Sequence, residues 1–168
     1  LALALNALPL RKDKLTEVRE PIELLARIIA GEHTEATEIV TQKDGRFHFR
    51  LPEGELNISL VAEGYRKIAT LYYLLKNGSV TPDTILFWDE PEASLNPELI
   101  VELVKVLQML ASVGVQIFVT THDYLLSYEL SLTAEYPSDK TADIKFLPCT
   151  DRTEHPVFRS NPVRHWRR

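Results

Sequence analysis

The sequence Thr84-Ile85-Leu86-Phe87-Trp88-Asp89-Glu90-Pro91-Glu92-Ala93-Ser94-Leu95-Asn96-Pro97 joins an apolar run to a pair of acids. The run is bounded by turn-forming residues, which predicts a short strand buried on both faces. Asp89 and Glu90 follow at its carboxyl end, where ligands bind in open α/β sheets. Because charge is costly to bury without a compensating cation or donor, these acids indicate a ligand site. The simpler alternative is an acid pair that caps the next helix.

The composition is that of one ordinary globular domain, or of part of one. The chain has 168 residues, of which 45% are hydrophobic and 26% charged, and its net charge of −5 gives no basic field for nucleic acid. Cys149 is the single cysteine, so the chain alone forms no disulfide or cysteine-based metal site. A reducing, cytoplasmic compartment fits this usage. The apolar start Leu1-Ala2-Leu3-Ala4-Leu5 is too short to span a membrane, and we interpret it as the interior of an element.

The first third of the sequence predicts a helix and then a β-hairpin. Apolar residues recur at helical spacing between residues 14 and 30, Gly31 stops the pattern, and Pro21 could open a fresh helix. Residues 35–60 have the composition of strands, and Asp44-Gly45 is a hairpin turn signal. His48 falls on the polar face of this hairpin, where we expect it to be solvated.

A helix–strand–helix–strand pattern follows. The first helix carries the apolar stripe Ile68, Leu71, Tyr72 and Leu75. Beyond the acids, Asn96 and Pro97 suit the start of a second helix, Gly114 ends it, and Val115 opens the next strand. A strand–helix–strand unit with short joins makes its strands parallel. Asp89-Glu90 and Thr120-Thr121-His122-Asp123 are therefore expected at one edge of the sheet.

The end of the chain carries weaker signals. Residues 124–132 continue as a short helix, residues 134–143 are polar and indicate a loop, and Ile144-Lys145-Phe146-Leu147 predicts a last strand. The basic tail from Asp151 suits a flexible, solvated end, with contact to nucleic acid or a partner as the alternative.

Three ordered motifs resemble those of ABC-type ATPases, and most of all the bacterial AAA-type, OLD-like ATP-binding proteins. The acidic strand resembles Walker B, residues 93–97 resemble the D-loop, and Val119-Thr120-Thr121-His122-Asp123 resembles the switch-histidine loop. The resemblance covers about residues 56–132. It implies a partial P-loop NTPase fold of the α/β class with a parallel sheet core. Residues 1–55 would then form a helical and β-hairpin subdomain, and residues 133–168 a C-terminal extension.

The resemblance also implies ATP and Mg²⁺ as cofactors. Asp89 would coordinate Mg²⁺, Glu90 would polarise the attacking water and His122 would contact the γ-phosphate. Ser94 and Asn96 occupy the D-loop, which in this family meets the opposite protomer of a head-to-tail dimer. The usual residue at the end of that loop is Asp, and Asn96 is compatible with a plain capping role.

A degenerate signature motif is expected at Ala62-Glu63-Gly64, where related proteins show Ser-Glu-Gly. The alanine removes one hydroxyl donor for a phosphate. A helix N-terminus with a glycine still suits an anion, and Arg66 and Lys67 add positive charge. Glu63 and Gly64 are therefore candidate nucleotide-binding residues, with an ordinary helix start as the alternative.

The phosphate-binding motif G-x-x-x-x-G-K-[ST] is absent, since none of the six glycines is followed by Lys-Ser or Lys-Thr. We therefore expect the later half of a dimeric ATPase domain, whose phosphate loop lies outside these residues and whose hydrolysis drives an effector or nuclease partner in defence or DNA repair. One alternative is a non-catalytic interaction module that binds no nucleotide alone. Another is a metal-dependent hydrolase built on Asp89, Glu90 and His122, which would require a further ligand.

Overall fold

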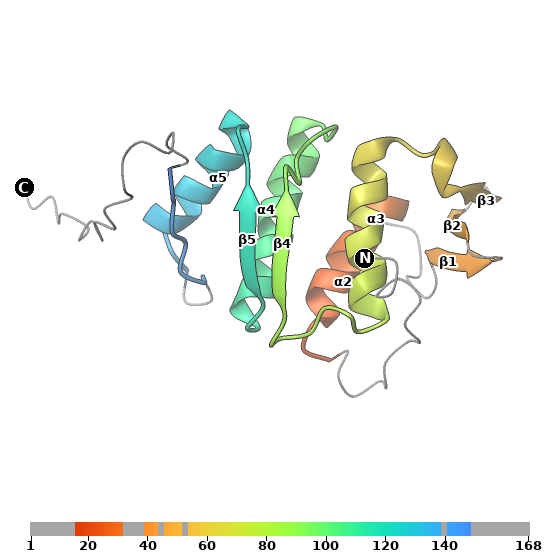
Figure 1. Ribbon diagram of the computed structural model, residues 1–168, viewed down its shortest axis with the longest axis horizontal. Helices are drawn as coiled ribbons and strands as arrows, with labels where there is room; N and C mark the ends of the chain where they lie inside the picture. The colour runs from red at the N-terminus through yellow and green to blue at the C-terminus, as the bar shows by residue number, and fades with distance from the viewer. Residues whose placement is uncertain (1–15, 32–38, 44–45, 52–53, 139–140, 149–168) are drawn as a thin grey trace, which may run out of the picture.

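The computed structural model describes residues 16–31, 39–43, 46–51, 54–138 and 141–148. Its elements in chain order are α2 (Arg19–Ala30), β1 (Val40–Lys43), β2 (Arg46–Leu51), β3 (Gly54–Asn57), the 3-10 turn η2 (Ile58–Leu60), α3 (Glu63–Lys76), β4 (Ile85–Asp89), α4 (Pro97–Ser112), β5 (Gln116–Thr120) and α5 (Tyr124–Glu135). The described part of the chain thus has an α/β fold with a parallel strand pair. Figure 1 shows β4 and β5 side by side with α4 behind them, α3 and α2 beyond β4, and the β1–β2–β3 sheet at the far end.

The predicted β-hairpin is confirmed. β1 and β2 are antiparallel, and their register runs from Val40 with Phe49 to Lys43 with Arg46. The predicted turn residues, 44 and 45, lie outside the described residues. β3 adds a third antiparallel strand to β2, within the span where the sequence indicated strands. Phe49 on β2 is buried and belongs to the same core as α2 and α3, so the hairpin packs onto the helices.

The first described helix is shorter than the periodicity suggested. α2 begins at Arg19, and Pro21 is its third residue, not the first. The start of the predicted span, residues 14 and 15, lies outside the described residues. Gly31 ends the helix as expected: its φ is 77°, and its N–H donates to the Arg27 carbonyl at 2.8 Å. A positive φ is a conformation that glycine adopts without steric cost.

Helices α3 and α4 each contribute a row of buried apolar residues to the core. The predicted stripe of α3, residues Ile68, Leu71, Tyr72 and Leu75, is buried throughout. Asn96 caps α4 as expected, since its side chain accepts a hydrogen bond from the Leu99 N–H at 2.8 Å. Pro97 is the first helical residue, where a missing N–H costs nothing.

β4 and β5 are parallel, as the strand–helix–strand pattern predicted, and their register pairs Asp89 with Thr120. The prediction that β4 is buried on both faces is wrong. Leu86 and Trp88 pack against the core, but Phe87 is 75% exposed and stacks on Phe118 with ring centroids 4.9 Å apart. Within the described residues, helices cover a single face of this sheet, so the second face of β4 contacts solvent.

The remaining predictions concern the end of the chain. α5 extends to Glu135, beyond the expected end at residue 132. The strand predicted at residues 144–147 is wrong: this segment is irregular, and Phe146 and Leu147 are exposed. A strand requires a hydrogen-bonding neighbour, and no described strand pairs with it. The basic tail from Asp151 lies outside the described residues, and the division into segments at residues 55 and 132 stays a prediction.

Candidate active site

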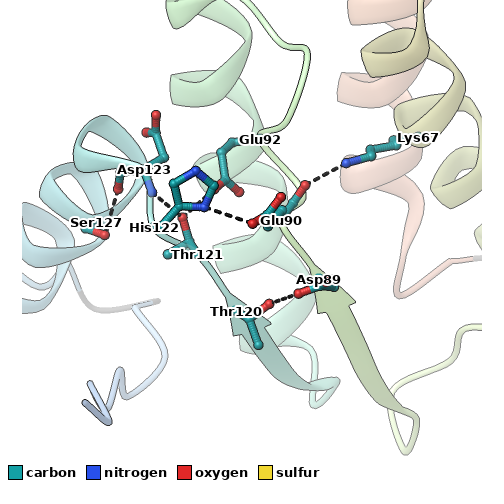
Figure 2. A network of polar contacts seen from close by, with 9 residues as sticks. All are labelled: Lys67, Asp89, Glu90, Glu92, Thr120, Thr121, His122, Asp123 and Ser127. Atoms are coloured by element: carbon teal, nitrogen blue, oxygen red, sulfur yellow. Dashed lines mark hydrogen bonds and ion pairs between the residues drawn. The ribbon is translucent and has the colours of Figure 1, made fainter. Parts of the chain in front are cut away.

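The carboxyl ends of β4 and β5 bring the two predicted motifs together, as Figure 2 shows. Asp89 and Thr120 end the paired strands, and the Thr120 hydroxyl donates a hydrogen bond to Asp89 Oδ1. One residue further on, the Glu90 N–H donates to the Thr120 carbonyl at 3.0 Å. The parallel pairing thus continues into the first loop residue and fixes where the Glu90 side chain begins.

Glu90 and His122 form the central contact of the site. His122 Nδ1 lies 2.8 Å from Glu90 Oε1, and the two side chains are 81% and 44% exposed respectively. Because an ionised carboxylate only accepts hydrogen bonds, Nδ1 carries the proton in this contact. The ring nitrogen Nε2 is left outside the pair. The expectation that these two residues share one sheet edge is confirmed.

The loop after β4 has an unusual backbone. Glu90 has φ 43° and Ser94 has φ 69°, both in the left-handed region that non-glycine residues rarely adopt. Such conformations cost of order 1–3 kcal/mol each and persist only where neighbours hold them. Lys67 Nζ on α3 donates to the Glu90 carbonyl at 2.7 Å and is one such neighbour. This is a more specific contact than the added positive charge that the sequence suggested for Lys67.

The expected signature and D-loop residues lie side by side. A Cβ built on Gly64 would stand 2.5 Å from the Ser94 carbonyl oxygen and 2.6 Å from Leu95 Cδ2. The glycine therefore permits the start of α3 to pack closely on the loop of the same chain. Glu63, Ser94 and Asn96 are exposed at this junction.

Glu92 is a candidate functional residue that the sequence did not reveal. Its side chain is only 5% exposed, and it is the one buried side chain among the described charged residues. The Thr121 hydroxyl donates to Glu92 Oε1, while Oε2 is buried without a hydrogen-bond partner among the described residues. Nothing in its spacing separates Glu92 from an ordinary acid before a helix. The one signal in the sequence is Thr121, the hydroxyl residue beside His122. It becomes a possible partner of Glu92 only once both loops are known to lie at one edge of the sheet.

The donor set at the strand ends fits Mg²⁺ bound together with a nucleotide. Asp89 is exposed and offers hard carboxylate oxygen, and Mg²⁺ is usually held by one or two carboxylates plus phosphate oxygens and water. Within the part of the chain that the structure describes, no three His, Cys, Asp or Glu side chains form a group that could hold a metal. The further ligand that a metal-dependent hydrolase would require is therefore not found among these residues.

Comparisons with solved structures give distant similarities. A structure from work on ATP-driven dimerization and DNA-stimulated activation of SMC ATPases aligns with 69% of this chain and 78% of its own, at 11% identity and a TM-score of 0.42. The Smc head domain of Pyrococcus furiosus, solved with an extended coiled coil and bound to the C-terminal domain of ScpA, aligns with 70% of this chain and 30% of its own, at 11% identity and a TM-score of 0.46. No curated protein matches the sequence. Among the described helices, none has the length and apolar character needed to cross a membrane.

A protein-family comparison covers most of the sequence. Residues 8–127 match the family described as "AAA domain, putative AbiEii toxin, Type IV TA system". This span contains α2 to β5, the acids after β4 and His122. The chain therefore belongs to this AAA domain family of P-loop ATPases, and its function is of the ATPase type.

Proposed function

We propose that this chain supplies the Walker B strand, D-loop and switch histidine of a site that binds and hydrolyses ATP. The observation that carries the proposal is the 2.8 Å contact between Glu90 and His122 at the carboxyl ends of two parallel strands, with Asp89 next to it. Three polar side chains with different chemistry meet at one edge. A merely structural acid pair would not require the histidine of a separate loop.

Each residue has a role that its position supports. Glu90 accepts a hydrogen bond from the attacking water and aligns that water with the γ-phosphorus of ATP. His122 donates from Nε2 to a γ-phosphate oxygen when it is protonated, since Nδ1 is already paired with Glu90. Asp89, held by the Thr120 hydroxyl, would hold Mg²⁺, which supplies charge neutralisation on the phosphates when bound.

The nucleotide would lie at a dimer interface. The start of α3 and the loop at Ser94 pack against each other, and their exposed residues Glu63, Ser94 and Asn96 would face the partner protomer. The amide donors at the start of α3 suit a phosphate of the partner's nucleotide. Because the phosphate-binding motif is absent from this sequence, that loop would come from another segment of the natural chain.

Hydrolysis would drive an effector or nuclease partner. The family description names an AbiEii toxin of a Type IV TA system, which supports the defence role, with DNA repair as the other process. We also propose that the protein is an OLD-like ATPase and that it is located in the cytoplasm. The alternative, a non-catalytic interaction module, is favoured by one observation, the lack of the phosphate-binding motif.

Substitution of Glu90 tests the catalytic role. In the natural chain with its phosphate loop, Glu90→Gln keeps the shape but removes the negative charge that aligns water. We expect ATP hydrolysis to fall by roughly 100-fold or more with ATP binding retained, since the interaction is made mainly in the transition state. Glu98→Gln, an exposed acid in the first turn of α4, is the matched control and should leave hydrolysis unchanged. Hydrolysis at the wild-type rate in Glu90→Gln would overturn the assignment.

A further inference from the structure

Three consecutive residues at the end of β5 each contact an acid at the end of β4 or in the loop after it. Thr120 reaches Asp89, Thr121 reaches Glu92 and His122 reaches Glu90. Thr120 and His122 are exposed, whereas Thr121 is half-buried. Consecutive side chains of an extended chain point to opposite sides. A contact that holds Thr121 inward therefore turns His122 outward, toward Glu90.

The Thr121–Glu92 contact is the inward one. We propose that Glu92 and Thr121 form a bridge between the loop after β4 and the loop after β5, and that this bridge positions His122 for ATP hydrolysis. The inference rests on the proposed function. Neither residue has to touch the nucleotide, so both are positioning residues.

The Thr121 hydroxyl links two further groups. It gives its single proton to Glu92 Oε1 and accepts a hydrogen bond from the Asp123 N–H at 3.0 Å. Asp123 in turn caps α5, since its Oδ1 accepts from the Leu126 N–H at 2.8 Å. His122 lies between Thr121 and Asp123, and both neighbours are held by this hydroxyl. Figure 2 shows Glu92, Thr121 and Asp123 beside His122.

The burial of Glu92 explains why the bridge is specific. A carboxylate that is buried to this degree is tolerated only where donors compensate it, and Thr121 is the donor seen for Oε1. Removing the hydroxyl would leave the carboxylate without that donor and the Asp123 N–H without its acceptor. The backbone at His122 would then be free to shift, and a shift of about 1 Å at a catalytic group can cost on the order of 100-fold in rate.

The kinetic test compares variants that keep or remove the hydroxyl in the natural ATPase chain. Thr121→Val keeps the shape without the hydroxyl, and we expect kcat to fall by about tenfold or more with KM for ATP within about twofold. Thr121→Ser keeps the hydroxyl and should stay within about twofold of the wild-type kcat. The matched control is Thr133→Val, which removes a half-buried hydroxyl that donates to the Glu129 carbonyl within α5 and should change neither constant. A wild-type kcat in Thr121→Val, or a change in KM alone, would overturn the proposal.

A double variant separates positioning from plain stability. Thr121→Val leaves a buried carboxylate unpaired, whereas adding Glu92→Met replaces both polar partners by apolar groups. We expect the double variant to regain the melting temperature that Thr121→Val loses while its kcat stays low. Recovery of kcat together with the melting temperature would show a merely structural role and contradict the proposal.

Hydrogen exchange provides a readout that requires no nucleotide. The Asp123 amide should exchange faster in Thr121→Val than in the wild-type chain, because its acceptor is the Thr121 oxygen. Unchanged exchange would refute the bridge whatever the kinetics show. If the wild-type chain with its phosphate loop hydrolyses no ATP, the proposed function and the role of the bridge in it are both overturned, and exchange still decides whether the bridge exists.

Discussion

The helical core packs apolar side chains away from water, whereas the loops after β4 and β5 hold charged side chains, and the loop after β4 has a strained backbone. In the core, Leu103 and Ile68 are fully buried. In the loops, Glu90 and Ser94 have positive φ, and Glu92 buries a carboxylate oxygen without a described partner. Local strain of this kind concentrates at functional sites, where the rest of the fold supports it. We therefore expect the core to determine the stability of the protein and the loops to carry the proposed ATP hydrolysis.

A cavity in the core should have the largest effect on stability. Leu103 on α4 is completely buried, so Leu103→Ala should lower the free energy of unfolding by about 2–5 kcal/mol. Urea denaturation measures this loss. Lys105→Ala on the same helix removes only an exposed pair with Glu102 and should change stability by no more than about 1 kcal/mol. Equal losses of unfolding free energy in the two variants would mean that the buried face of α4 contributes little to the stability of the core.

A side chain at Gly64 tests the junction between core and site. The added Cβ of Gly64→Ala would approach the Ser94 carbonyl oxygen to 2.5 Å, so the backbone of one element must move. Overpacking of this kind costs about 1–3 kcal/mol, again measurable by urea denaturation. Arg66→Ala, an exposed change in the same turn of α3, should lie within about 0.5 kcal/mol of the wild type. Unaltered stability in Gly64→Ala would disprove the close approach.

Relief of loop strain should give the smallest effect, with the opposite sign. Ser94 has φ 69°, so Ser94→Gly removes a steric penalty and should raise the free energy of unfolding by up to about 1 kcal/mol. The adjacent Ala93 is not among the residues with positive φ, and Ala93→Gly should lower stability by about 0.5–1 kcal/mol. A loss in both variants would show that the loop is not strained at Ser94.

Much of the fold could be predicted from the sequence because local rules determine it. The pairing of β1 with β2, the stripe of α3 and the Asn96 cap each depend on a few neighbouring residues. The shared edge of the two loops followed from one strand–helix–strand unit. Such features depend on periodicity and short-range hydrogen bonds, which a single sequence displays.

The errors concern contacts between distant segments. The open face of β4 depends on what packs against Phe87, and an apolar run cannot show this. Residues 144–147 have strand composition, but a strand also requires a partner. The burial of Glu92 depends on Thr121, which lies 29 positions away in the sequence. The positive φ of Glu90 likewise depends on contacts from β5 and α3.

Titration calorimetry of ATP with Mg²⁺ tests the central claim most directly. It should be performed on this 168-residue chain and on a version extended upstream by the proposed phosphate-binding loop. The proposed site predicts binding by the longer chain and not by the shorter one, because Asp89, Glu90 and His122 complete a site that the phosphate loop begins. If neither chain binds nucleotide, the ATP-hydrolysing role is wrong for this protein and the non-catalytic interaction module takes its place.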